Sequence, residues 1–294
     1  MIYLLVATVI WGSSFVAQRA GMETIGPLTF ASARYTLSTA ALAVWFAVLA
    51  IRRKSKGEKL ANLRGTLIGG ILCGLLSFAA TTTQQIGIVT ASSGKSGFLT
   101  AMYIVFAPIV GIMFGKKTSR LVWLAVALSF VGMAFVCYEP GIFFIKQDLW
   151  LVSCAILFTF QIMLVDKYAA KVDAILFMLV STVLCMVLTI ACMFVWENPI
   201  KLGSFPQILA NWFPLMYSGV LSGAVAYTLQ VYGQRKAHPS VASLVMSLEA
   251  VFAAVFGWLI LRESMSALQI TGCALMFAAT VAATSPQWLR RVYE

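Results

Sequence analysis

Charged residues are scarce in this sequence of 294 residues. Asp, Glu, Lys and Arg together make up 11% of it, only 10 residues are acidic, and there is one histidine. A soluble domain carries about a quarter of its residues as charged side chains. Apolar residues instead reach 61%, with a mean hydropathy of +0.92. Because a water-soluble chain could not bury so much apolar surface, the composition argues against a cytosolic enzyme, a nucleic-acid-binding module or a disordered chain. It predicts an integral membrane protein.

The motifs that hold metals and nucleotides are also missing. None of the six cysteines forms a CxxC pair, and the single histidine, His238, has no nearby thiols or carboxylates in the sequence. No Walker A motif and no HExxH motif is present. We therefore expect no metal, no cofactor and no ATP-driven mechanism, and we do not expect an enzyme.

Ten stretches are long enough and poor enough in charge to cross a bilayer as helices, which takes roughly 20 residues each. They are residues 1–18, 28–51, 65–94, 96–115, 121–138, 149–165, 174–196, 202–234, 237–261 and 264–289. Because backbone groups in lipid must be hydrogen-bonded internally, we predict an all-α membrane protein with ten spans. The chain starts directly in the first apolar run without a basic segment, so no cleavable signal peptide is expected.

The basic residues gather in alternate connections, which predicts the orientation. One side would hold Arg52, Arg53, Lys54, Lys56, Lys59, Arg64, Lys116, Lys117, Arg120, Lys167, Lys171, Arg235, Lys236, Arg290 and Arg291. The other side would hold only Arg19, Lys95, Lys146, Lys201 and Arg262. By the positive-inside rule, both termini are expected to be cytoplasmic.

The two halves of the sequence resemble each other. Residues 66–117 align with 212–263 without a gap, so that Gln84 meets Gln230 and Val105-Phe106-Ala107 meets Val251-Phe252-Ala253. Five helices per half is an odd number, so the second half would enter the membrane inverted. We expect repeats at residues 1–138 and 148–289 around a central site that alternating access exposes to each side.

Three segments carry a resemblance to a known family. They are Trp11-Gly12-Ser13-Ser14-Phe15, then Gly97-Phe98-Leu99-Thr100 with Val105-Phe106-Ala107-Pro108, and Ser247-Leu248-Glu249-Ala250-Val251-Phe252. With the ten spans and the repeat, the whole chain resembles the EamA-type branch of the drug/metabolite transporter superfamily. It departs at Ala250, where the family usually has proline. The resemblance implies secondary transport through a cavity lined mainly by helices one to four and six to nine. It also implies that helices five and ten lie to the side, where homodimer contacts could form.

Two charged residues fall inside the expected spans, where each is costly. Glu249 could join two helices through hydrogen bonds, or it could face the cavity as a titrating group or a cation contact. Its aligned partner in the first half is Tyr103. Arg34 could snorkel to the outer face, pair with Glu249 or hold a substrate carboxylate. Lys95 could be an interfacial anchor or could turn inward to form a positive vestibule with Arg34.

Uncharged polar residues complete the predicted site. Gln84 and Gln230 are aligned by the repeat and are the preferred lining pair, and Gln161 should also avoid lipid. Aromatic and hydroxyl side chains in the spans are weaker candidates, because such residues more often pack in the core. The full predicted substrate-binding set is Trp11, Ser14, Arg34, Gln84, Lys95, Tyr103, Gln161, Tyr227, Gln230 and Glu249.

We therefore predict a multi-pass secondary transporter of the cell (inner) membrane. It would move a small organic metabolite, such as an amino-acid-like solute, in uptake or efflux, with a proton or a counter-solute as coupling partner and no nucleic acid. A receptor or scaffold without transport is one alternative. A lipid-modifying membrane enzyme is another, although the sequence shows no convergent catalytic cluster.

Overall fold

The computed structural model describes residues 1–57, 62–91, 93–116, 118–136, 138, 145–198, 205–262 and 265–284. These ranges are helical and contain no strand. The elements are α1 (Ile2–Gly21), α2 (Pro27–Lys56), α3 (Leu63–Ile88), α4 (Ser93–Ala101), α5 (Tyr103–Met113), α6 (Arg120–Val136), α7 (Asp148–Ala169), α8 (Ala174–Trp196), α9 (Phe205–Ala210), α10 (Trp212–Met216), the π-helix η1 (Tyr217–Ala226), α11 (Tyr227–Gln234), α12 (Pro239–Met246), α13 (Glu249–Leu261) and α14 (Ala267–Thr284).

Within the described ranges, seven helical stretches are long and apolar enough to cross a membrane. Five are the single helices α1, α2, α3, α7 and α8, and two are the divided stretches Ser93–Met113 and Pro239–Ile260. Helices α6 and α14 are apolar but shorter, and residues 205–234 are divided among α9, α10, η1 and α11. The predicted all-helical, multi-pass architecture is thereby confirmed, while the count of ten spans stays a prediction. The predictions for Lys59, Lys117, Lys201, Arg290 and Arg291 lie outside the described residues.

The two divided spans break at equivalent places. Helix α4 ends at Ala101 and α5 begins at Tyr103, while α12 ends at Met246 and α13 begins at Glu249. The repeat alignment pairs Tyr103 with Glu249, so both are the first residues of the second helix in a broken span. The break at Glu249 occurs even though position 250 is alanine rather than proline.

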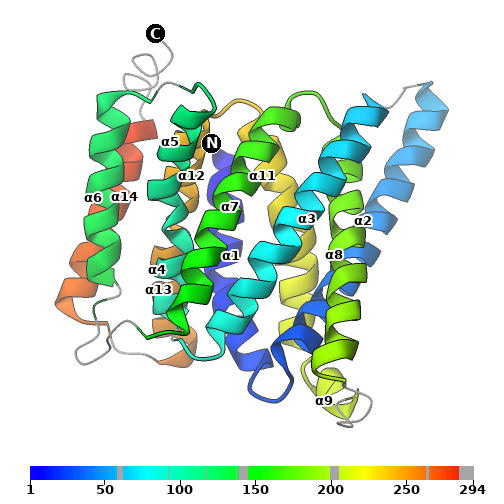
Figure 1. Ribbon diagram of the computed structural model, residues 1–294, viewed down its shortest axis with the longest axis horizontal. Coiled ribbons are helices and arrows are strands. Elements are labelled where there is room, and N and C mark those ends of the chain that lie inside the picture. Colours follow the sequence, from blue (N-terminus) through cyan, green and yellow to red (C-terminus); the bar gives the residue numbers. More distant parts are fainter. Residues whose placement is uncertain are drawn as a thin grey trace.

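The helices stand side by side as one bundle, with α1 near its middle (Figure 1). Helices α6 and α14 pack together at one edge, and α2, α3 and α8 form the opposite edge. Two glycines let α3 approach α8 closely: a Cβ atom on Gly70 or Gly74 would lie 2.9 Å from the carbonyl oxygen of Phe177 or Ser181, respectively. Small residues of this kind support close helix packing in membranes.

Helices α2 and α8 are joined at both ends. At one end, the Arg53 guanidinium lies 2.5 Å from the carboxylate of Asp173, the residue that caps the N-terminus of α8. At the other end, the Glu197 carboxylate accepts hydrogen bonds from the backbone N–H groups of Leu28 and Thr29 and from the Thr29 hydroxyl, each at 2.7 Å. Glu197 therefore satisfies N–H donors that the first turn of α2 would otherwise leave unpaired.

Helix α7 is joined to the divided span α4–α5 in the same manner. Lys95 at the start of α4 lies 2.7 Å from Asp148 at the start of α7, and Lys116 after α5 lies 2.9 Å from Asp166 near the end of α7. In the first pair Asp148 is buried and the Lys95 side chain is 14% exposed, whereas the Lys116 side chain is 44% exposed. These contacts hold α7 directly against the broken span.

Candidate functional site

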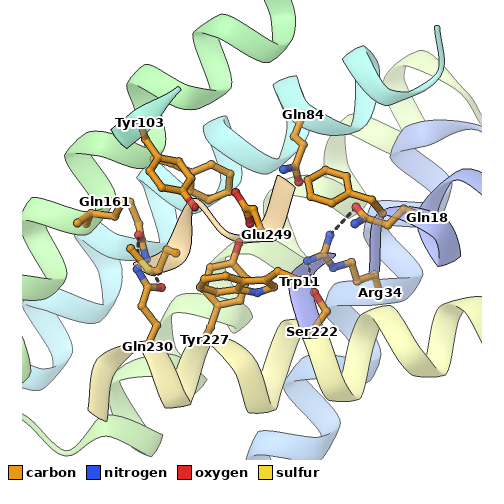
Figure 2. A pocket seen from close by; sticks show the side chains of 14 residues that line it. Trp11, Gln18, Arg34, Gln84, Tyr103, Gln161, Ser222, Tyr227, Gln230 and Glu249 are labelled. Carbon is orange, nitrogen blue, oxygen red and sulfur yellow. Dashed lines mark hydrogen bonds between the residues drawn. The ribbon is translucent and has the colours of Figure 1, made fainter. Parts of the chain in front are cut away.

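A cavity lies inside the bundle, lined by side chains from both halves of the chain (Figure 2), and its empty space, counted together with the part that is open to solvent, is about 440 Å³. Its walls come from helices α1, α2, α3, α5, α7, η1, α11, α12 and α13. The lining residues are Trp11, Phe15, Gln18, Arg34, Gln84, Tyr103, Phe158, Gln161, Ile162, Ser222, Tyr227, Gln230, Met246 and Glu249.

The structure brings together most of the residues that the sequence singles out. Those that line the cavity are Trp11, Arg34, Gln84, Tyr103, Gln161, Tyr227, Gln230 and Glu249, whereas Ser14 and Lys95 are not among the lining residues. The aligned glutamines Gln84 and Gln230 reach the same cavity from α3 and α11.

Arg34 is buried at one end of the cavity, with 2% of its surface exposed. Its guanidinium donates to Gln18 Oε1 at 3.0 Å through Nη1 and to Ser222 Oγ at 3.2 Å through Nη2. Within the described part of the chain, its Nε–H group has no hydrogen-bond partner and the guanidinium has no carboxylate within 4 Å. The structure therefore shows neither snorkelling nor an ion pair with Glu249 in the described chain; it shows Arg34 held by Gln18 and Ser222, and its contact with a substrate stays a prediction.

Glu249 lies in the same cavity as the first residue of α13, and it is 4% exposed. Its Oε1 atom has no hydrogen-bond partner among the described residues, and the Tyr103 hydroxyl of α5 lies close enough to interact with the carboxylate. Both alternatives for Glu249 therefore stay open: it could join α13 to α5 through Tyr103, or it could act as a group that faces the cavity. The N-terminus of α13 favours a negative charge at this position.

Aromatic rings surround the Glu249 carboxylate. Figure 2 shows Trp11, Tyr103 and Tyr227 around it, and the Tyr103 and Tyr227 hydroxyls lie within electrostatic range of its charge. Trp11 and Tyr227 pack edge to face, with ring centroids 5.0 Å apart. The indole N–H of Trp11 has no partner within the described ranges. A carboxylate beside aromatic faces is an environment that attracts a cationic group.

The glutamines are held in more complete hydrogen-bond networks. Gln161 and Gln230 exchange hydrogen bonds of 3.3 and 3.0 Å between their amide groups, which ties α7 to α11. Gln84 donates to the Thr100 hydroxyl at 3.3 Å. Because these amides already bond to protein, they shape the cavity wall more than they offer free donors.

Two predicted site residues, Lys95 and Ser14, do not line the cavity and instead contact residues next to it. Lys95 pairs with Asp148 at 2.7 Å, and the vestibule predicted to combine it with Arg34 is not formed by these side chains. Ser14 is fully buried and accepts a hydrogen bond of 3.2 Å from Gln18 Nε2. Ser14 therefore reaches the cavity only through Gln18.

Two cavity residues that hold Arg34, Gln18 and Ser222, are not among the residues predicted from the sequence. Gln18 could have been found by its spacing: Trp11, Phe15 and Gln18 stand at positions i, i+4 and i+7 of α1 and so share one face. Ser222 gives no comparable signal, because it lies in the π-helix η1, where the helical period differs from 3.6.

The cavity thus carries one positive and one negative side chain, without an ion pair between them in the described structure. It offers donors at Arg34 and Trp11 and an acceptor at Glu249. No group of three or more potential metal ligands occurs among the described residues. Chemically, the arrangement can bind a small solute that carries both charges, with aromatic and aliphatic walls for its apolar part.

Comparisons with known proteins agree over nearly the full length of the chain. The EamA-like transporter family matches residues 1–138 and 145–285. An uncharacterized transporter of Archaeoglobus fulgidus is 25% identical over 282 residues, which cover 95% of this chain and 83% of that protein. The uncharacterized inner membrane transporter YedA of Escherichia coli K12 is 24% identical, with coverage of 96% and 89%. The uncharacterized transporter YoaV of Bacillus subtilis is 22% identical, with coverage of 94% and 93%. A crystal structure with 14% identity has the same fold, with a TM-score of 0.75 over 100% of this chain and 98% of that chain.

Proposed function

Because this chain belongs to the EamA-like transporter family, we propose that it is a secondary transporter that moves a small organic metabolite across the cell membrane by alternating access. Its helices make it a multi-pass protein of the cell membrane, in contact with the lipid bilayer. The observation that carries the proposal is the central cavity, in which Arg34 and Glu249 are buried without pairing to each other. Buried charges that the fold itself does not pair are typical of solute pathways in membranes.

We propose that the solute is amino-acid-like. Its carboxylate would bind Arg34, whose Nε–H group is unpartnered within the described chain, and its ammonium group would bind Glu249 between the aromatic rings. The two charges come from different halves of the chain, so a bound solute would connect those halves. The ten predicted residues stay candidates, with Trp11, Tyr103 and Tyr227 as the walls and Ser14 and Lys95 as supporting positions.

We also propose that the chain forms ten membrane helices in two inverted repeats, residues 1–138 and 148–289. The twofold match to the family, at 1–138 and 145–285, supports this division. The equivalent breaks before Tyr103 and Glu249 support it further. The alternating distribution of basic residues favours cytoplasmic termini.

Coupling and assembly remain predictions from the sequence. Glu249 is the candidate for carrying a coupling proton, and exchange against a counter-solute is the alternative. A homodimer would use the edge formed by α6 and α14. The direction of transport, uptake or efflux, is to be measured.

The proposal is tested with purified protein in proteoliposomes. Counterflow of a panel of labelled amino acids and other small metabolites is measured in both directions, for the wild type and for Arg34→Leu. We expect at least one solute to move with the wild type and its counterflow to fall strongly with the variant. If no solute moves although the protein is folded and inserted, transport is contradicted and the receptor or scaffold alternative takes its place.

A further inference from the structure

Gln18 is the residue that fixes the position of Arg34. It lies in the last turn of α1, lines the cavity and is 3% exposed. Its amide nitrogen donates to both the backbone oxygen and the hydroxyl of Ser14, each at 3.2 Å. Its amide oxygen accepts from Arg34 Nη1 at 3.0 Å.

This network allows only one orientation of the amide. If the Gln18 amide were turned over, its NH₂ group would face the guanidinium, and two donors would oppose each other. The two acceptors of Ser14 hold the NH₂ group on the side of α1. The carbonyl oxygen is therefore kept toward Arg34, and Ser14 acts as the support for this arrangement.

The partners of Arg34 are neutral. Gln18 and Ser222 each accept one of its hydrogen bonds, and no carboxylate lies within 4 Å of it in the described structure. A guanidinium has five N–H donors, these two bonds use two of them, and the Nε–H group has no partner in the described structure. A glutamate at position 18 would place a negative charge where the amide oxygen is now, and it would occupy Arg34 permanently.

We infer that Gln18 positions Arg34 without neutralising it and so determines the charge of the solute that the cavity selects. The inference rests on the proposed transport function and deepens it. With Gln18, the cavity holds one free positive and one free negative side chain and selects a dipolar ion. With an acid at position 18, its net charge becomes negative and the preference moves to cations.

The first test measures the chemical reactivity of the Arg34 side chain and requires no solute. Purified protein is treated with 2,3-butanedione, which attacks neutral guanidine groups, and modification of Arg34 is followed by peptide mass spectrometry with the exposed Arg52 as internal reference. Gln18→Glu should slow the reaction about tenfold or more, because the new carboxylate holds the proton on the guanidinium. Gln18→Met should speed it severalfold, and Ser14→Ala should act like Gln18→Met to a smaller extent. Gln207→Glu, which adds the same charge at an exposed position of α9, should leave the rate unchanged.

The second test measures which charge type the cavity prefers to bind. It uses three probes of equal carbon number: L-norvaline (dipolar), valerate (anionic) and pentylammonium (cationic). Thermal shifts should be largest for norvaline with the wild type and largest for pentylammonium with Gln18→Glu. Gel filtration and the melting temperature without probe verify that each variant is folded.

The outcomes separate the two proposals. If the Arg34 reaction rate is the same in Gln18→Glu, Gln18→Met and the wild type, the role of Gln18 is overturned. If the rate changes but Gln18→Glu keeps the wild-type order of the probes, charge selection by Gln18 is overturned. If the rate changes and none of the probes stabilises any variant, the positioning role of Gln18 is supported, while charge selection and the amino-acid-like solute of the proposed function both fall.

Discussion

Replacing Glu249 with glutamine removes the negative charge from the cavity while keeping the size of the side chain. At an effective dielectric constant of about 20, unit charges about 4 Å apart attract each other by about 4 kcal/mol. Desolvation of the solute ammonium group offsets part of this attraction. We expect a net loss of about 1.5 to 3 kcal/mol, which is roughly a 10- to 100-fold rise in KM for a dipolar solute. The measurement is counterflow in proteoliposomes with the solute found in the panel.

The stability of this variant distinguishes a solute contact from a structural role. Glu249 accepts no hydrogen bond at Oε1 within the described chain, and a glutamine there keeps an amide oxygen that can accept from the Tyr103 hydroxyl. We therefore expect the melting temperature of Glu249→Gln to equal or exceed that of the wild type. Glu23→Gln, the same change at an exposed position, is the control and should alter neither quantity. A KM within twofold of the wild-type value, or a clear loss of stability, would refute the reasoning.

Three other predictions concern the ion pairs that join helices, the close packing of helices at a glycine, and the coupling of transport to protons. Lys95→Met should lower the free energy of unfolding by about 3 kcal/mol because it leaves the buried Asp148 carboxylate without its cationic partner, with the Ile145 backbone N–H as its remaining donor among the described residues. In the same denaturation assay, Lys116→Met at the half-exposed pair should cost less than about 1 kcal/mol. Gly74→Val should lower the melting temperature, because overpacking costs about 1–3 kcal/mol, and Gly94→Val, whose added Cβ atom meets nothing within 4 Å, is its control. If Glu249 carries the coupling proton, Glu249→Gln should abolish the pH dependence of transport, and full retention of that dependence in a flux assay would contradict the role.

Much of the cavity lining could be predicted from the sequence because placing polar side chains in lipid is energetically costly. Arg34, Glu249 and the glutamines lie in stretches that are otherwise apolar, so each needs a protein or water environment. The repeat alignment added a second constraint by pairing Gln84 with Gln230. Both kinds of signal depend only on residue type and position along a helix.

The remaining features of the site depend on tertiary contacts between residues distant in sequence, and the periodicity of residue types along the sequence does not reveal such contacts. Lys95 turns away from Arg34 because Asp148, distant in sequence, lies at the start of the neighbouring helix. Ser222 reaches Arg34 from a π-helix, where counting at 3.6 residues per turn fails. The breaks before Tyr103 and Glu249 also escape a hydropathy count, because apolar residues continue through them.

The cap that Glu197 places on α2 has a consequence for biosynthesis. The ribosome makes the first turn of α2 about 170 residues before the carboxylate that satisfies its N–H groups. Until α8 is inserted, that helix end depends on water or lipid headgroups for hydrogen bonds. The N-terminal half made alone should therefore be a short-lived substrate for membrane proteases, and co-expression of the C-terminal half from a second gene should rescue it.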